Sequence, residues 1–287
     1  MSMNLFDLPG PRARARHRIY AVVGTLAVVG VVAFVIFRFA DSGQFDARRW
    51  EWIEYAQIQR DLIDALVNTL KAFAIGAVLA LIFGAIFAAG RLSDHAIIRV
   101  PSMLVVELFR AIPLVILMFV FHYGIGLGAP INSVVLGLML YNGAVLAEIF
   151  RAGVLALPRG QSEAAYAVGM RKTQVMNLVL LPQALRAMLP AIVSQLVVLL
   201  KDTALGFLIT YEELLRYARF LGSQAQFGRP LVPLTIVVAA MYIVMCLLLT
   251  WLAHYLSKRE RRSKKHLDLE GPKPEEVQLA SALSTGA

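Results

Sequence analysis

Cysteine and charge are both scarce in this chain of 287 residues. Its one cysteine, Cys246, lies in an apolar segment, which excludes a disulfide framework and a cysteine-based metal site. Only 16% of the residues are charged and 59% are hydrophobic, whereas ordinary globular domains have about 25% charged and about 45–50% apolar residues. Together with long apolar runs, this balance places the chain among membrane proteins.

Sequence motifs for enzymatic chemistry are also missing. No G-x-x-x-x-G-K-[ST] phosphate loop is present, and the glycines at 124, 126 and 128 do not form a dinucleotide fingerprint. We therefore expect no catalytic residues, no metal site and no cofactor bound by this chain. The net charge of +9 does not indicate nucleic acid, because the basic residues cluster at the ends of apolar runs.

Apolar runs predict an all-α transmembrane fold with five or six spans. A spanning helix needs about 20 mainly apolar residues, because each adds about 1.5 Å across a core about 30 Å thick. The predicted spans are 19–40, 65–90, 101–123, 131–150, 187–207 and 231–256.

Basic residues predict the orientation of these spans. With both termini in the cytoplasm, cytoplasmic stretches as far as Lys265 hold 17 Lys and Arg residues and the opposite side holds 6. The positive-inside rule therefore favours six spans with both ends inside. Residues 1–18 are then a basic cytoplasmic N-terminus, and 41–60 are an outer linker whose Trp50, Trp52 and Tyr55 suit a short interfacial helix. Residues 258–287 are too polar to bury a core and are expected to form a disordered cytoplasmic tail.

A charged side chain within a span costs free energy if it faces lipid, so we expect the charged residues of the spans to be paired or functional. Glu107 with Arg110, and Glu148 with Arg151, are spaced i,i+3 and can pair on one helix face. Such pairs near the cytoplasmic ends could steady the bundle, or they could line a polar path.

A second polar group lies deeper in the predicted spans. Lys201 is 14 residues into the span that begins at 187, which places it about 21 Å along the helix. Lys201 and the adjacent Asp202, followed by Thr203, could bind the two charged groups of a zwitterion or form a structural pair. Asn142 interrupts the fourth span and must face a helix partner or a cavity.

Small residues recur every four positions along the second predicted span. In lipid, a face of small residues lets two helix backbones approach closely, so this face predicts a tight helix–helix contact. The residues are Ala72, Gly76, Ala80, Gly84 and Ala88.

The stretch GQSEAAYAVGMRKTQVMNLVLLPQALRAMLP, residues 160–190, interrupts the apolar pattern. Residues 161–168 and 171–180 each predict a short helix, and Gly169 suits the turn between them because it tolerates positive φ. Pro182 is expected to end the second helix. We predict a rigid cytoplasmic helix–turn–helix that either docks a soluble partner or is a structured loop without one.

The same stretch resembles the EAA signature of bacterial ABC importer permeases. The signature is matched by Glu163-Ala164-Ala165, Gly169, Val179 and Leu181-Pro182. Three further segments are similar to the polar amino-acid permease family, and the extra first span resembles glutamate/aspartate-type members. These segments are VELFRAIPLVIL (106–117), AVLAEIFRAGVLALPRGQSEAA (144–165) and LLKDTALGFL (199–208).

The resemblance implies a type I ABC importer permease, with one extra N-terminal helix (19–40) before a five-helix core. The core is 61–257 and contains the EAA coupling loop at 158–186. The implied partners are a second permease subunit, which the longer N-terminus suggests is a different homologous chain, two ATPase subunits and an external solute-binding protein. ATP and Mg²⁺ would be bound by the ATPases, and this chain would perform no covalent chemistry.

The resemblance also implies roles for particular residues. Those expected to couple the chain to the ATPase are Glu163, Ala164, Ala165, Gly169, Arg171 and Pro182. The resemblance also makes four residues candidates for the substrate path: Asn142, Lys201, Asp202 and Thr203. Where the family often has R-G-T-P, this chain has Arg110-Ala111-Ile112-Pro113, so no substrate role is assigned there.

The predicted function is therefore the transmembrane permease subunit of an amino-acid importer. The substrate expected first is glutamate, with glutamine, another polar amino acid or a basic amino acid as alternatives. A secondary transporter and a membrane scaffold are the alternatives from other classes. The exposed EAA hairpin argues against the first, and the Lys201-Asp202 pair within a span argues against the second.

Overall fold

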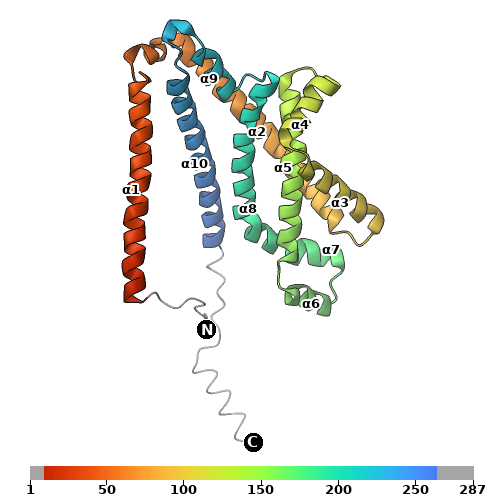
Figure 1. Cartoon of the computed structure of the whole chain (residues 1–287). Helices are drawn as coiled ribbons and strands as arrows, with labels where there is room; N and C mark the ends of the chain where they lie inside the picture. Colours follow the sequence, from red (N-terminus) through yellow and green to blue (C-terminus); the bar gives the residue numbers. More distant parts are fainter. Residues whose placement is uncertain (1–9, 264–287) are drawn as a thin grey trace, which may run out of the picture. The chain divides into compact units, whose positions relative to one another are not determined.

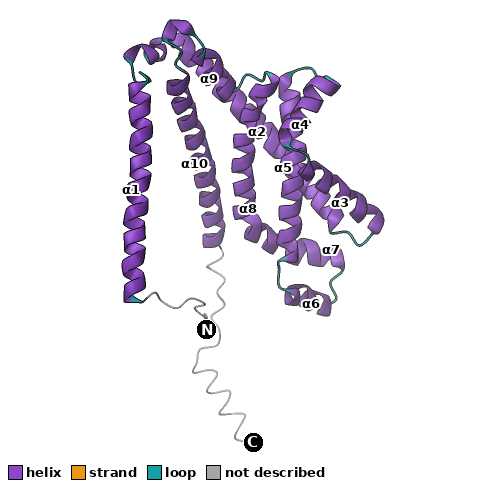
Figure 2. Cartoon of the chain, in the orientation of Figure 1, coloured by secondary structure: helices purple, strands orange, loops and turns teal. Residues whose placement is uncertain are grey.

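The computed structural model describes residues 10–263, and within this range the secondary structure is entirely helical (Figures 1 and 2). Residues 1–9 and 264–287, which include most of the predicted C-terminal tail, lie outside it. The α-helices are α1 (Pro11–Asp41), α2 (Ala56–Arg91), α3 (Ala96–Ala111), α4 (Leu114–Phe119), α5 (Pro130–Leu155), α6 (Arg159–Ala167), α7 (Lys172–Gln174), α8 (Leu181–Asp202), α9 (Leu214–Gly222) and α10 (Leu231–Ser263). Short 3₁₀ helices are Ala47–Arg49, Glu51–Glu54, Thr203–Ile209 and Ala225–Phe227, and π-helical turns are Val120–Ile125 and Val175–Leu180.

Among residues 10–263, five helical stretches are long and apolar enough to cross a membrane, and a bent pair counted as one span gives a sixth. The five are α1, α2, α5, the run Lys172–Ile209 and α10. The prediction of a continuous third span over 101–123 is wrong, because α3 and the segment Leu114–Ile125 meet at an angle of 96°. Pro113 causes the break: a residue before proline is driven out of the helical region, and Ile112 has φ −85° and ψ 125°.

Pro182 does not end a helix, contrary to the prediction from the sequence. The chain is helical from Lys172 to Ile209, and Pro182 occupies the first turn of α8. The π-helical turn Val175–Leu180 lies directly before it. Proline is tolerated in a first turn because its missing N–H is not needed there. The second arm of the hairpin and the fifth span are therefore one helical run.

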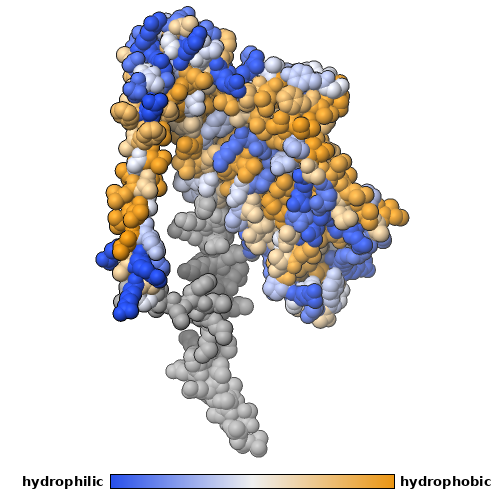
Figure 3. Space-filling view, in the orientation of Figure 1, coloured by the Kyte–Doolittle hydropathy of each residue, from blue (hydrophilic) through white to orange (hydrophobic). Residues whose placement is uncertain are grey.

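The described residues form two compact units. The first contains the chain up to Ile63 together with Tyr217–Val238. Here the linker after α1 folds into two short 3₁₀ helices, and the side chain of Trp52 is buried, with 3% exposure. Tyr55 contacts Phe227 edge to face, with ring centroids 5.3 Å apart. In the same unit, α1 is apolar along most of its length with a basic N-terminal end (Figure 3), and no residue of its most apolar window is buried.

The second unit contains Asp64–Arg216 and the chain from Ala239 onward. Its centre is α5, which packs against α3, α4 and α8 (Figure 1). Among the fully buried side chains, Leu138 and Leu146 of α5 lie opposite Gly76 and Gly84 of α2. The predicted tight contact is confirmed: Ala72, Gly76, Ala80, Gly84 and Ala88 are all buried.

Replacing Gly84 with alanine is expected to lower the thermal unfolding midpoint of the purified chain. A Cβ at this position would lie 2.9 Å from the Cβ of Leu146 and 3.1 Å from the carbonyl oxygen of Gly143, so α2 and α5 must move apart. Overpacking of this kind typically destabilises by about 1–3 kcal/mol. Gly24→Ala is the matched control, because nothing lies within 4 Å of its added Cβ. Equal thermal unfolding midpoints for the two variants would show that α2 and α5 accommodate the added methyl group without strain.

Candidate functional site

The turn of the hairpin is a Schellman motif, the helix ending in which a glycine adopts positive φ. Gly169 has φ +83°. Its N–H donates to the carbonyl of Tyr166 at 2.9 Å, and the N–H of Met170 donates to the carbonyl of Ala165 at 3.2 Å. These are the two hydrogen bonds of that motif. The spacing from Ala165 to Gly169 in the signature is therefore the spacing that ends α6 and reverses the chain.

The second arm of the hairpin is fixed by side chains of its own. The backbone N–H of Arg171 donates to Oε1 of Gln174 at 2.9 Å, which caps the start of this arm. Val175 is fully buried, and the π-helical turn that it begins packs against α6. Beside Pro182, Gln183 donates from Nε2 to Oε1 of Gln161 at 3.2 Å, which joins α8 to α6. The two arms consequently form one structured element.

The outer surface of α6 is available for contact. Glu163 and Ala164 are exposed, whereas Ala165 is buried toward the second arm. Tyr166 and Val168 are 49% and 78% exposed. An acidic residue beside exposed apolar side chains on a rigid hairpin can dock a partner through both shape and charge. Tyr166 and Val168 lie within the range Glu163 to Gly169 for which the resemblance implies a coupling role.

The hairpin is also tied to the loop between α2 and α3. Lys172 forms an ion pair with Asp94, and this hydrogen-bonded ammonium lowers the pKa of the Asp94 carboxyl below its ordinary value. Both side chains are at least half exposed, so the pair adds little stability by itself. Because the folded-state pKa is lowered, this contribution is present above the ordinary pKa of Asp94 and is lost as the pH falls through the lowered value.

Three polar side chains meet between α5 and α8. Asn142, which is fully buried, donates from Nδ2 to Oδ2 of Asp202 at 3.2 Å. Nε2 of Gln195 donates to Oδ1 of Asn142 at 2.7 Å. Asn142 therefore faces helix α8, and the structure brings it together with Asp202 as a polar group within an apolar bundle. Gln195 was missed from the sequence, although its i,i+7 spacing from Asp202 places both on one face of α8.

The other two residues of the predicted path are placed differently. Lys201 is exposed, and among residues 10–263 it has no ion-pair partner. Thr203 is fully buried and donates to the carbonyl of Leu200 at 2.7 Å. The adjacent Lys201 and Asp202 do not pair with each other, because successive residues of a helix point in different directions. Asp202 is thus available to Asn142, and Lys201 adds a free cation on the same helix.

A network of charges joins α2, α3 and α5. Glu107 pairs with Arg110 at 3.3 Å, and Glu148 pairs with Arg151 at 2.6 Å. Arg91 bridges the two pairs, lying 3.4 Å from Glu107 and 3.1 Å from Glu148, and its side chain is only 9% exposed. In the sequence Arg91 is only a basic residue after a span, and the tertiary structure makes it the centre of the network.

A buried carboxylate after the 3₁₀ turn Thr203–Ile209 was also missed. Glu213 is fully buried and accepts hydrogen bonds from the backbone N–H groups of Leu215 and Arg216 at 2.8 and 2.7 Å. It thereby caps the start of α9. Tyr242 of α10 donates its hydroxyl to the same carboxylate at 3.0 Å. Burial raises the pKa of Glu213 to about 7 despite these donors.

Glu213 predicts a pH dependence of stability. Its folded-state pKa of about 7 lies above the ordinary value of 4.5, so the native state binds more protons between these values and its stability falls as the pH rises. From pH 5.5 to 8 the expected loss is about 2 kcal/mol. The thermal midpoint should therefore be higher at pH 5.5, and Glu213→Gln should abolish most of this difference. An unchanged difference in the variant would assign the pH dependence to other groups.

A bundle of apolar spans that carries an exposed helical hairpin defines a multi-pass membrane permease of the type I ABC importer fold. Residues 76–262 match the family described as the binding-protein-dependent transport system inner membrane component. The chain belongs to this family.

Relatives and a solved structure support the assignment. The chain is 37% identical to the glutamate transport system permease protein GluD of Corynebacterium glutamicum, over 82% of this chain and 88% of the relative. It is 32% identical to the probable glutamine ABC transporter permease protein GlnP of Bacillus subtilis, over 69% and 93%. A crystal structure of an amino acid ABC transporter with histidines matches with a TM-score of 0.64 at 28% identity, over 72% of this chain and 98% of that one.

Proposed function

We propose that this chain is the membrane-spanning subunit of an ATP-driven importer for a polar amino acid, with glutamate as the first substrate to test. The observation that carries the proposal is the hairpin of α6 and the following helical run, in which the Schellman turn at Gly169 presents Glu163 on an exposed, rigid surface. The relatives named for glutamate and glutamine support this substrate class.

In this proposal the hairpin transmits mechanical work. Two ATPase subunits bind ATP and Mg²⁺, and the hairpin docks on one of them at the cytoplasmic face. Because its second arm continues without a break into α8, a displacement of the hairpin moves the helix that carries Gln195 and Asp202. Closure of the ATPases would then drive a rigid-body change between inward-open and outward-open states.

The polar group of Asn142, Gln195 and Asp202 is the proposed substrate path. Together with the exposed Lys201, it offers a carboxylate, two amides and a cation at a depth where lipid supplies no hydrogen bonds. These groups are complementary to an ammonium and a carboxylate, and therefore to a zwitterion. A second permease subunit, a homologue of this chain, would complete the path, and an external binding protein would deliver the substrate.

The test is uptake of labelled glutamate by proteoliposomes that hold this chain with its ATPase, its second permease and its binding protein. We expect uptake to require ATP and to be inhibited by excess unlabelled glutamate more strongly than by glutamine or arginine. Stronger inhibition by glutamine or arginine would reassign the substrate within the same class. Uptake that persists without ATP and follows an ion gradient would contradict the proposed mechanism and favour a secondary transporter.

A further inference from the structure

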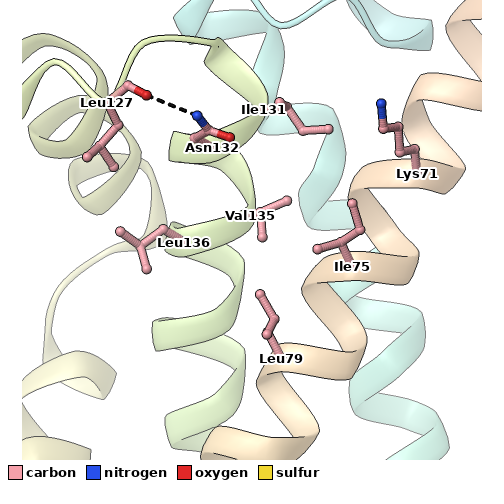
Figure 4. A pocket seen from close by; sticks show the side chains of 8 residues that line it. All are labelled: Lys71, Ile75, Leu79, Leu127, Ile131, Asn132, Val135 and Leu136. Atoms are coloured by element: carbon pink, nitrogen blue, oxygen red, sulfur yellow. Dashed lines mark hydrogen bonds between the residues drawn. The ribbon is translucent and has the colours of Figure 1, made fainter.

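A groove of about 530 Å³ lies between α2 and α5, away from the polar group around Asn142. Six of its eight lining residues are aliphatic, and the two polar ones are Lys71 of α2 and Asn132 of α5. Figure 4 shows Lys71 and Asn132 toward one end of the groove and Leu79 toward the other. The groove is therefore amphipathic along its length, with its polar groups at a single end. The aliphatic residues are Ile75, Leu79, Leu127, Ile131, Val135 and Leu136.

The polar end of the groove coincides with one end of the apolar part of α2. Residues 72–90 of this helix include no charged side chain, and Lys71 and Arg91 flank them. Twenty residues of helix separate the two cations by about 30 Å, which is the thickness of a bilayer core. Because Arg91 lies at the end of α2 that leads to Asp94 and the hairpin, Lys71 lies toward the opposite membrane boundary, about 9 Å from the start of the predicted span at residue 65. From this depth the long side chain of a lysine reaches the lipid headgroups.

The groups at this end are free to bind a ligand. Lys71 is exposed and has no ion-pair or hydrogen-bond partner among residues 10–263. Asn132 donates from Nδ2 to the carbonyl of Leu127 at 3.0 Å, which orients its amide, and no described residue donates to its Oδ1. The site therefore offers one cation for an anionic group and one acceptor for a hydroxyl or ammonium.

The aliphatic part of the groove continues from that end toward the middle of the membrane. Lys71, Ile75 and Leu79 are spaced i,i+4,i+8, so they form one stripe along α2 that is about 12 Å long. Val135 of α5 lies across from it (Figure 4). A small dicarboxylate amino acid could use Lys71 but would find no polar partner along this stripe. A ligand with an anionic head and a hydrocarbon tail is complementary to the whole groove.

We propose that the α2–α5 groove is a binding site for an anionic phospholipid. The phosphate is held by Lys71, the headgroup hydroxyls or glycerol face Oδ1 of Asn132, and one acyl chain follows Ile75 and Leu79 along α2. The site selects for negative charge because Lys71 is its only ionic group. It selects for a lipid over a soluble anion because most of its surface is aliphatic.

The experiment is native mass spectrometry of the full-length chain in detergent, titrated with phosphatidylglycerol or with phosphatidylcholine of the same acyl chains. We expect phosphatidylglycerol to bind about fivefold more tightly, the effect of one lysine at a membrane surface. Lys71→Gln should remove this preference, and Lys71→Arg should retain it. Arg60→Gln is the matched control, because Arg60 is an exposed cation of the same helix with no ion-pair partner among residues 10–263, and it should leave the preference unchanged.

A second variant tests the aliphatic stripe. Ile75 is 40% exposed, so Ile75→Trp fills the groove without disturbing the core, and it should weaken binding of both phospholipids. The proposal is wrong if Lys71→Gln leaves the preference for phosphatidylglycerol intact. It is also wrong if soluble glutamate or inorganic phosphate binds in a Lys71-dependent way while the lipids do not, or if the substitutions change only self-association of the chain.

Discussion

Replacing Gly169 with valine is expected to reduce ATP-driven uptake by about tenfold or more and to weaken co-purification of the ATPase. The glycine has φ +83°, a region that β-branched residues avoid, and strain of this kind costs about 1–3 kcal/mol. No atom lies within 4 Å of an added Cβ, so the effect comes from the backbone and not from a clash. Relief of the strain breaks the Schellman hydrogen bonds and changes the direction in which α6 presents Glu163. Uptake by proteoliposomes and the yield of co-purified ATPase measure the two effects.

The control for this variant is Gly160→Val. Gly160 lies in the same hairpin, within α6, and an added Cβ there also meets nothing within 4 Å, but its φ is not positive. It should retain uptake and ATPase binding. Normal uptake and co-purification by Gly169→Val would contradict the docking role of the hairpin. Equal losses in the two variants would show that any bulk on this surface interferes and that the turn geometry is not the cause.

Replacing Asp202 with alanine is expected to reduce uptake about tenfold or more and to abolish stimulation of ATP hydrolysis by substrate, with assembly unchanged. The variant removes the acceptor for Nδ2 of Asn142, a fully buried side chain, and it removes the carboxylate from the proposed path. An unsatisfied buried amide costs about 1–3 kcal/mol, so a moderate loss of stability accompanies the loss of transport. Thermal midpoint, ATPase co-purification and uptake should be measured on one preparation.

Asp202→Asn separates the two roles of this carboxylate. Asparagine keeps the shape of the side chain and an oxygen that can accept from Asn142, but it removes the negative charge. If the charge contributes to transport, Asp202→Asn should be as deficient in uptake as Asp202→Ala while its thermal midpoint stays close to that of the unsubstituted chain. Normal uptake by both variants would make the group around Asn142 a structural contact between α5 and α8.

The sequence was most informative where a local rule applied. Apolar run lengths located the spans, because the thickness of the bilayer sets the length of a spanning helix. The four-residue spacing from Ala72 to Ala88 predicted a packed face of α2, because side chains four residues apart lie on one side of a helix. Gly169 predicted a turn because it tolerates a backbone conformation that other residues avoid.

Local rules failed at two prolines, each for a different reason. Hydropathy made 101–123 one span, but Pro113 bends it by 96°, since the average apolarity of a window contains no information about backbone direction. Pro182 was expected to end a helix, but the run from Lys172 to Ile209 contains it in the first turn of α8. Whether a proline ends or begins a helix depends on the hydrogen bonds of the preceding turn, here a π-helical one.

By itself, the sequence determined the class of protein, most of the apolar spans and the position of the exposed hairpin, because composition, run length and motif spacing are local properties of a chain. Only the tertiary structure decided which polar groups meet. It joined Asn142 to both Asp202 and Gln195, did not pair Asp202 with Lys201, and placed Arg91 between Glu107 and Glu148. It also left Lys71 at the open end of an apolar groove. These contacts join residues far apart in the chain, and only the packing of one helix against another brings them within a few ångströms.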